Sequence, residues 1–167
     1  SLICASLARG RSTIWGPHIR PEIMDLIAML RAMGAEIRVY GQERIEVDGT
    51  DALGGADHTV IPDNMEALTW MIGAAITGGE VEIRDFPLRD LEVPLAFLKE
   101  SGVRYFVGDE ALIVRPGACY PVEIATGPYP GINSDMQPLF AAFGAMSPGE
   151  SRIVDLRFPG RYAYAEE

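Results

Sequence analysis

The sequence predicts an α/β fold (α+β by some schemes) in which helices and short strands recur as one repeated unit. Three pairs of similar segments support this prediction, and in each pair the second segment starts 67 to 69 residues after the first. The pairs are 7–14 with 76–83, 25–40 with 92–107, and 44–49 with 111–116. A third copy begins at 135–154, so the chain repeats the order helix, strand, helix, strand, strand.

The first complete copy carries its own boundary signals. Pro21 stands at a tolerated first-turn position of a helix, and Gly34 is expected at the C′ position that ends it. The apolar residues between these ends recur at helical spacing: Ile23, Leu26, Ile27, Leu30 and Met33. The segment 35–40 then alternates as a strand, and a turn at Gly41 leads into the next strand, 44–47.

The second copy has equivalent signals. Its helix contains Pro94, so regular helical hydrogen bonding is expected to begin only near that residue. Gly102 is its capping glycine, and Gly108 with Asp109 forms the turn between its two strands.

A boundary is predicted between the two copies. The segment 48–63 is rich in glycine and aspartate, so we expect two globular parts, 1–61 and 62–167. The first part is expected to be the less stable, and proteases are expected to cut within 48–58. A crossing strand is predicted at 58–61.

Two aspartates precede predicted helices. Asp63, with Glu66 three residues later, forms a capping box at the start of a helix over 64–76. Asp135 stands at the equivalent place in the third copy, although Pro138 replaces the glutamate of the box. An N-cap role is therefore one interpretation of Asp135.

Composition narrows the possible partners. A net charge of −10 argues against nucleic acid and against an anionic membrane surface, but it allows a small anionic substrate held by a few arginines. No apolar run is long enough to span a bilayer, and the two cysteines form no disulfide framework, which suits a reducing cytoplasm. The apolar opening and the uncapped end suggest a piece of a longer chain.

Several candidate sites are weighed and set aside. His18 and His58 have no partner at ligand spacing, so no metal site is predicted. Cys4 lies on an apolar helical face and is expected in the core. Cys119 lies near Arg115, but without a histidine partner it is expected to be inert. For the basic cluster near the end, a solvated strand face is the plainest interpretation: Arg152, Arg157 and Arg161.

Three motifs, together with the repeat, resemble the enolpyruvyl transferase family. They are HTVIPDNMEALTWMIGAAITGG (58–79), PYPGINSDMQ (128–137) and RFPGRY (157–162). The resemblance implies two inside-out α/β barrel-type domains of three βαβαββ units each, with the active site between them. By this resemblance 1–61 is the closing unit of one domain, truncated at its start. Residues 62–167 are then the first unit and part of the next in the other domain.

The resemblance also implies a reaction. Members of the matching branch move the enolpyruvyl group of phosphoenolpyruvate onto the 3-hydroxyl of UDP-N-acetylglucosamine and release phosphate, with no metal or organic cofactor. This is the first committed step of peptidoglycan synthesis. Asp135 matches the carboxylate that contacts this hydroxyl and takes its proton. Arg157 and Phe158 match positions lining the UDP-sugar site, and Arg161 matches an arginine near phosphoenolpyruvate. The chain alone is expected to be inactive, because the other walls of the site come from the missing halves of the same protein.

The sequence departs from the family pattern around the acceptor. Ser134 replaces the usual threonine, Asn133 replaces a proline, Pro159-Gly160 replaces a common Glu-Asn pair, and Arg157 replaces an apolar residue. Two alternatives therefore stay open. One is a paralogue that uses a different nucleotide or sugar acceptor, and the other is a non-catalytic scaffold built from the same repeat.

Overall fold

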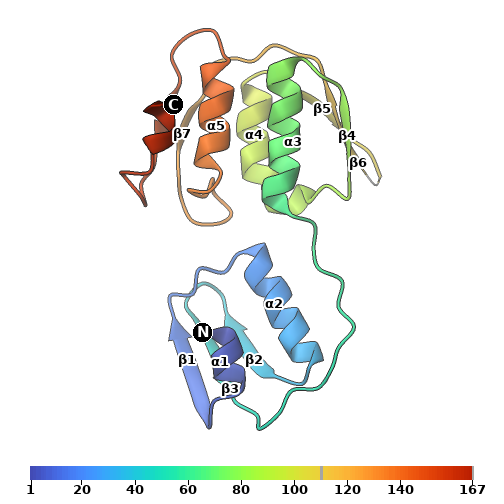
Figure 1. Ribbon diagram of the computed structural model, residues 1–167, viewed down its shortest axis with the longest axis vertical. Helices are drawn as coiled ribbons and strands as arrows, with labels where there is room; N and C mark the ends of the chain where they lie inside the picture. Colours follow the sequence, from blue (N-terminus) through green and yellow to red (C-terminus); the bar gives the residue numbers. More distant parts are fainter. Residues whose placement is uncertain (110, 167) are drawn as a thin grey trace. The chain divides into compact units, whose positions relative to one another are not determined.

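The computed structural model describes residues 1–109 and 111–166, which form two compact units. The units are Ser1–Ile61 and Pro62–Glu167, and each packs its helices against short β-strands (Figure 1).

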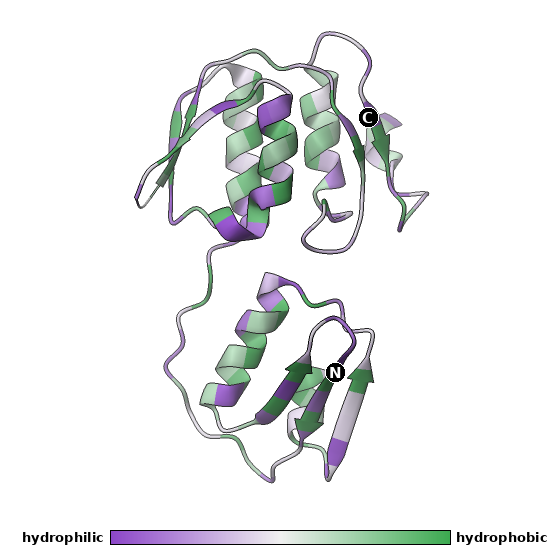
Figure 2. Cartoon of the chain, turned by 180° about the vertical axis from the view of Figure 1, so that it is seen from behind, coloured by the Kyte–Doolittle hydropathy of each residue, from purple (hydrophilic) through white to green (hydrophobic). Residues whose placement is uncertain are grey.

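The first unit contains two helices and a three-stranded sheet. In chain order the elements are α1 (Leu2–Ser6), β1 (Arg11–Trp15), α2 (Pro21–Ala32), β2 (Glu36–Tyr40) and β3 (Arg44–Asp48). The strand order is β1-β3-β2, with antiparallel neighbours throughout. Hydrophobic and hydrophilic residues alternate along β2 and β3 (Figure 2). The inward side chains of the sheet join those of both helices in one core: Leu2, Ala5, Ile19, Ile27, Leu30, Ala35, Ile37, Ile45 and Val47.

The predicted end of helix α2 is confirmed. Gly34 follows the helix with φ of 101°, a left-handed conformation that favours glycine, and the amide of Ala35 donates to the Leu30 carbonyl at 2.9 Å. At the other end, Pro21 is the first helical residue, as its missing N–H allows.

The outer face of the first sheet carries an ion-pair network centred on Asp48. Its two carboxylate oxygens accept hydrogen bonds from Arg11 Nε and from a terminal nitrogen of Arg38, each at 2.6 Å. These two hydrogen bonds lower the pKa of Asp48 to about 2. Beside them, the Arg44 guanidinium lies 4.0 Å from the ring centroid of Tyr40.

The second unit repeats this sheet and then adds a second βαβ segment. Its elements are α3 (Asn64–Thr77), β4 (Val81–Arg84), the 3-10 helix η1 (Leu88–Leu91), α4 (Glu92–Glu100), β5 (Arg104–Val107), β6 (Ala111–Arg115), β7 (Glu123–Ala125), α5 (Gln137–Ala145), β8 (Arg152–Val154) and the 3-10 helix η2 (Ala163–Glu166). The strand order β4-β6-β5 matches β1-β3-β2, so the predicted repeat is confirmed. Strands β7 and β8 form a separate parallel pair.

The local signals of the second unit are also confirmed at three places. Asp63 caps α3, because its carboxylate accepts from the amides of Met65 (2.7 Å) and Glu66 (3.1 Å). Pro94 lies in the first turn of α4, and Gly102 follows that helix with φ of 90°.

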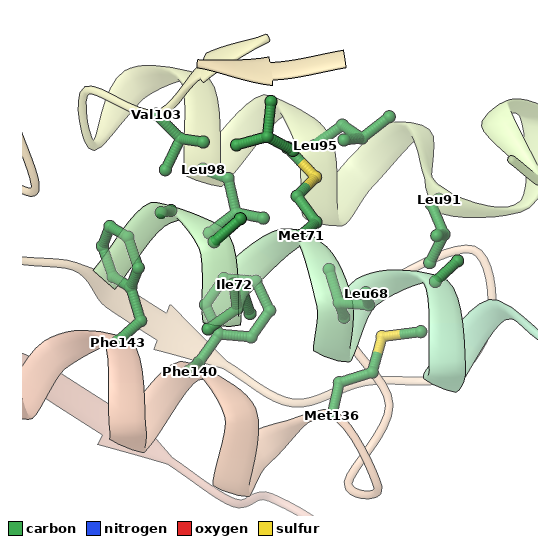
Figure 3. Packing of buried hydrophobic residues seen from close by; sticks show 14 of the residues in the cluster. Leu68, Met71, Ile72, Leu91, Leu95, Leu98, Val103, Met136, Phe140 and Phe143 are labelled. Carbon is green, nitrogen blue, oxygen red and sulfur yellow. The ribbon is translucent and has the colours of Figure 1, made fainter. Parts of the chain in front are cut away.

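Three helices form the main core of the second unit. Figure 3 shows Phe140 and Phe143 of α5 among side chains of α3 and α4, including Ile72 and Leu98. Both phenylalanines are fully buried. This core holds α5, and with it the segment that enters α5, against the rest of the unit.

Two predictions are wrong. No strand forms at 58–61, and Val60 is 71% exposed, because the segment finds no partner strand within the described chain. Cys4 is exposed rather than buried, because α1 is short and turns only Leu2, Ala5 and Ser6 inward. No helix in the described ranges is long and apolar enough to cross a membrane.

Candidate functional site

The candidate site lies where the parallel strands β7 and β8 end. Parallel strands have their carboxyl ends at one edge, and in open α/β sheets ligands bind beyond that edge. Thr126 follows β7 and Asp155 follows β8. Two loops leave from these residues. We call 127–136 the approach loop and 156–162 the arginine loop.

The approach loop is ordered by its own backbone. The amide of Gly127 donates to the Ile132 carbonyl at 2.7 Å, and the amide of Gly131 donates to the Pro128 carbonyl at 2.8 Å. The Tyr129–Pro130 peptide is cis. The buried side chain of Ile132 anchors the loop in the main core.

Asp135 is not an N-cap, so that interpretation of the residue is wrong. Helix α5 begins at Gln137, and Met136 is its N-cap. The side-chain oxygen of Asn133 accepts from the amides of Asp135 (2.9 Å) and Met136 (3.0 Å), so a turn precedes the helix. Because Asn133 makes this turn, the carboxylate of Asp135 is directed elsewhere.

The carboxylate of Asp135 contacts the arginine loop. A terminal nitrogen of Arg161 donates to Asp135 Oδ1 at 2.8 Å. About half of each side chain is exposed, at 48% for Asp135 and 46% for Arg161. A carboxylate and a guanidinium that lie 26 residues apart in the sequence therefore meet at the surface.

Three predicted substrate-binding residues gather on the arginine loop. The guanidinium carbons of Arg157 and Arg161 each lie 5.8 Å from the centroid of the Phe158 ring. Together with Pro159 and Gly160 these side chains line an open depression, and Phe158 is 49% exposed. Two cations beside an exposed aromatic ring suit a ligand that carries both an anionic group and a planar ring.

Sequence reasoning missed Asp155, which is buried between the two loops at 5% exposure. Its Oδ1 accepts from Thr126 Oγ1 and Ser134 Oγ, each at 3.0 Å, and from the amides of Arg157 and Phe158, each at 2.9 Å. Burial raises the pKa of Asp155, but these hydrogen bonds outweigh burial and lower it. The only sequence signal was an acidic residue directly after an apolar strand.

The side chains that were set aside show no arrangement for chemistry. Cys119 Sγ lies 3.6 Å from the Ala75 carbonyl oxygen, and burial raises the pKa of the thiol. His58 Nε2 lies 2.9 Å from Asp25 Oδ1. Within residues 1–109 and 111–166, no three His, Cys, Asp or Glu side chains are grouped so as to hold a metal ion.

Comparisons with known proteins all find similarity to carboxyvinyltransferases. The family model described as EPSP synthase (3-phosphoshikimate 1-carboxyvinyltransferase) matches residues 1–158. UDP-N-acetylglucosamine 1-carboxyvinyltransferase from Halorhodospira halophila is 35% identical over 99% of the chain and 40% of its own length. UDP-N-acetylglucosamine 1-carboxyvinyltransferase 1 from Symbiobacterium thermophilum is 39% identical over 99% of the chain and 38% of its own length.

Solved structures agree as well. The enolpyruvyl transferase NikO from Streptomyces tendae superposes with a TM-score of 0.84 at 28% identity, over 99% of the chain and 40% of that protein. EPSP synthase from Acinetobacter baumannii shares the fold, with a TM-score of 0.51 at 19% identity over 91% of the chain and 36% of its own length. The chain thus spans about 40% of the length of the curated relatives it matches.

Proposed function

Because the chain belongs to the EPSP synthase family of enolpyruvyl transferases, we propose that its protein transfers the enolpyruvyl group of phosphoenolpyruvate to the 3-hydroxyl of UDP-N-acetylglucosamine. The observation that carries this proposal is the contact between Asp135 and Arg161 beside Phe158, at the carboxyl edge of β7 and β8. The relatives that support the acceptor are named for that sugar nucleotide. A cytoplasmic location follows from the proposal, since both substrates are cytoplasmic.

Each side chain has a role in the proposed reaction. The carboxylate of Asp135 accepts a hydrogen bond from the sugar 3-hydroxyl and takes its proton as the oxygen bonds to the enolpyruvyl carbon; phosphate leaves. Arg161 lies beside the anionic donor and holds Asp135 in place. Phe158 offers a face for the uracil ring, and Arg157 offers charge for the diphosphate.

A second candidate is the same transfer to a different nucleotide or sugar acceptor. It is favoured by the residues that depart from the family pattern, because they stand at the site itself. Asn133 makes the turn before α5, and Pro159 with Gly160 lines the depression beside Phe158. The structural match to NikO, whose name states only enolpyruvyl transfer, is compatible with either acceptor.

The test uses the full-length gene product that contains this chain. Phosphate release from phosphoenolpyruvate is measured with UDP-N-acetylglucosamine and, separately, with other uridine nucleotides and UDP-sugars. Release that depends on UDP-N-acetylglucosamine supports the first candidate, and release only with another acceptor supports the second. No release with any acceptor would leave the scaffold hypothesis.

Asp135→Asn tests the proposed proton transfer. We expect turnover to fall by roughly 10²–10⁴-fold, the usual share of a positioned acid–base group. The fold should be retained, because an exposed ion pair contributes only about 0–1 kcal/mol. Affinity for the sugar nucleotide should fall less than turnover, since asparagine keeps one oxygen for the hydroxyl. Turnover within about threefold of the parent would rule out the proposed role.

A further inference from the structure

The two loops of the candidate site are joined twice, once at the surface and once below it. The surface link is the exposed ion pair of Asp135 with Arg161. The lower link is Asp155, where a single carboxylate oxygen accepts four hydrogen bonds. Two of the donors are the amides of Arg157 and Phe158, and a third is the hydroxyl of Ser134, the residue directly before Asp135.

The lower link is shielded from water. Asp155 is 5% exposed, Ser134 is 6% exposed and Thr126 is 2% exposed. Oδ2 of Asp155 is also buried, and it has no hydrogen-bond partner within the described chain. No ion pair of the described residues involves Asp155, so hydrogen-bond donors alone stabilise its charge. Burying a charged carboxylate costs free energy unless its hydrogen-bond donors stay in place. The positions of the donors therefore depend on one another through Asp155.

Further hydrogen bonds attach the carboxylate to the strands. Thr126 Oγ1 donates to Asp155 and accepts from the amide of Leu156 at 3.0 Å. The amide of Asp155 itself donates to the hydroxyl of Tyr162 at 2.7 Å, and that hydroxyl donates to the Ile153 carbonyl at 3.2 Å. Both ends of the arginine loop are therefore fixed relative to the end of β8.

We propose that Asp155 is a positioning residue that holds the approach loop and the arginine loop in one fixed arrangement, so that Asp135, Arg157, Phe158 and Arg161 face the ligand together. This inference rests on the proposed function of the two loops. It assigns Asp155 no contact with substrate, and its effect on kcat/KM runs through the placement of Asp135 and of the side chains of the arginine loop.

The test is Asp155→Asn in the full-length gene product, with and without Asp135→Asn. Asparagine lacks the negative charge that makes Oδ1 a strong acceptor, and its NH2 group would replace the buried Oδ2, which has no partner among the described residues, so the donors from the two loops are held less firmly. We expect kcat/KM to fall by about 10- to 100-fold in the parent, the cost of a misplaced reacting group. In the Asp135→Asn background the same change should lower kcat/KM by a clearly smaller factor than in the parent, because the part of the loss that runs through Asp135 is already gone and residues that act as a unit are not additive.

A second measurement does not need activity. Hydrogen exchange, followed by mass spectrometry, should show faster exchange in 127–136 and 156–162 together, with α3 unchanged. Glu123→Gln is the matched control, because the exposed side chain of Glu123 lies on β7 and its ion-pair partner is Arg152 of β8, at 3.7 Å, outside both loops. The control should leave both kcat/KM and exchange in the loops unchanged.

The outcomes separate the two proposals. If the parent releases no phosphate with any acceptor, the proposed function fails, and hydrogen exchange alone decides the role of Asp155. Faster exchange in only one loop, or an equal loss of kcat/KM in both backgrounds, would overturn the positioning role. If Asp155→Asn does not fold, Ser134→Ala replaces it. That variant should speed exchange in 127–136 and lower kcat/KM, and no change in either would equally overturn the proposal.

Discussion

The first complete repeat (β1, α2, β2, β3) and the second (β4, α4, β5, β6) order their strands alike, yet they differ in what covers the glycine that ends each helix. A Cβ added to Gly34 would meet nothing within 4 Å, whereas one added to Gly102 would lie 2.5 Å from the carbonyl oxygen of Ala118 and 2.7 Å from the ring of Tyr120. The segment after β6 packs over the second helix end. Gly34 is therefore needed only for its left-handed backbone conformation, whereas Gly102 is needed for that conformation and for the close approach of residues 118–120.

The repeats also differ in the charges on the outer sheet face. Arg11 of the first repeat pairs with Asp48, and at the equivalent place in the second repeat Glu80 pairs with Arg115. The signs are reversed, while the buried alternation of the central strands is the same. The comparison teaches that buried residues and helix-ending glycines set this fold, and that the surface charges can change sign within it.

The largest expected difference is in the stability of the two units. Unit 2 buries a cluster of eighteen hydrophobic residues and unit 1 a cluster of nine. Unit 2 (Pro62–Glu167) is also the longer unit, by about 45 residues, so at roughly 0.1 kcal/mol per residue the free energies of unfolding would differ by about 5 kcal/mol. Hydrogen exchange of the 167-residue chain at rising urea should show residues 1–48 opening first. Simultaneous opening of both units would contradict this expectation. Limited proteolysis should cut first within 48–58, of which only Asp48, the last residue of β3, lies in regular structure.

The next difference concerns the two glycines. Gly34→Ala forces a left-handed alanine and should cost about 1–2 kcal/mol. Gly102→Ala carries the same cost plus the overlap with Ala118, which adds about 1–3 kcal/mol. Urea midpoints of each unit, measured for both variants, test the order. If both variants lost the same free energy of unfolding, the segment 118–120 would have to move aside at no cost, which would contradict this expectation.

The smallest expected effect is the pH dependence of the outer ion pairs. The pKa of Asp48 is about 2 in the folded protein, below its ordinary value of 3.8, so its contribution is present above about pH 4 and is lost as pH falls through 2. Asp48→Asn should therefore lower the urea midpoint of unit 1 at pH 7 and should have a much smaller effect near pH 2, where about half of Asp48 is protonated in the folded protein. Glu80→Gln breaks a single pair and should change unit 2 less. A loss for Asp48→Asn that is equal at both pH values would exclude the ion pairs as its cause.

Local signals predicted much of the fold. Gly34, Gly102 and Asp63 act where the sequence placed them, because each of these effects depends on backbone geometry within a few residues. The strand expected at 58–61 failed because a strand also needs a neighbour, and alternation of residues does not supply one.

The site was predicted less completely. Asp135 and Arg161 were singled out, and the structure brings them together, but Asn133 rather than Asp135 makes the turn before α5. Asp155 was missed because its importance comes from four donors spread over 33 positions of the chain, from Thr126 to Phe158. No periodicity or spacing encodes such a convergence.

The reversed ion pairs bear on how a chain with tandem repeats avoids misassembly. Repeats of similar sequence can exchange strands during folding. If β1 paired with β6 by mistake, Arg11 would oppose Arg115, and if β4 paired with β3, Glu80 would oppose Asp48. Like charges directly opposite each other in a sheet destabilise the pairing by roughly 0.2–1 kcal/mol. The reversed order of charges in the two ion pairs therefore favours the pairing of each strand within its own sheet.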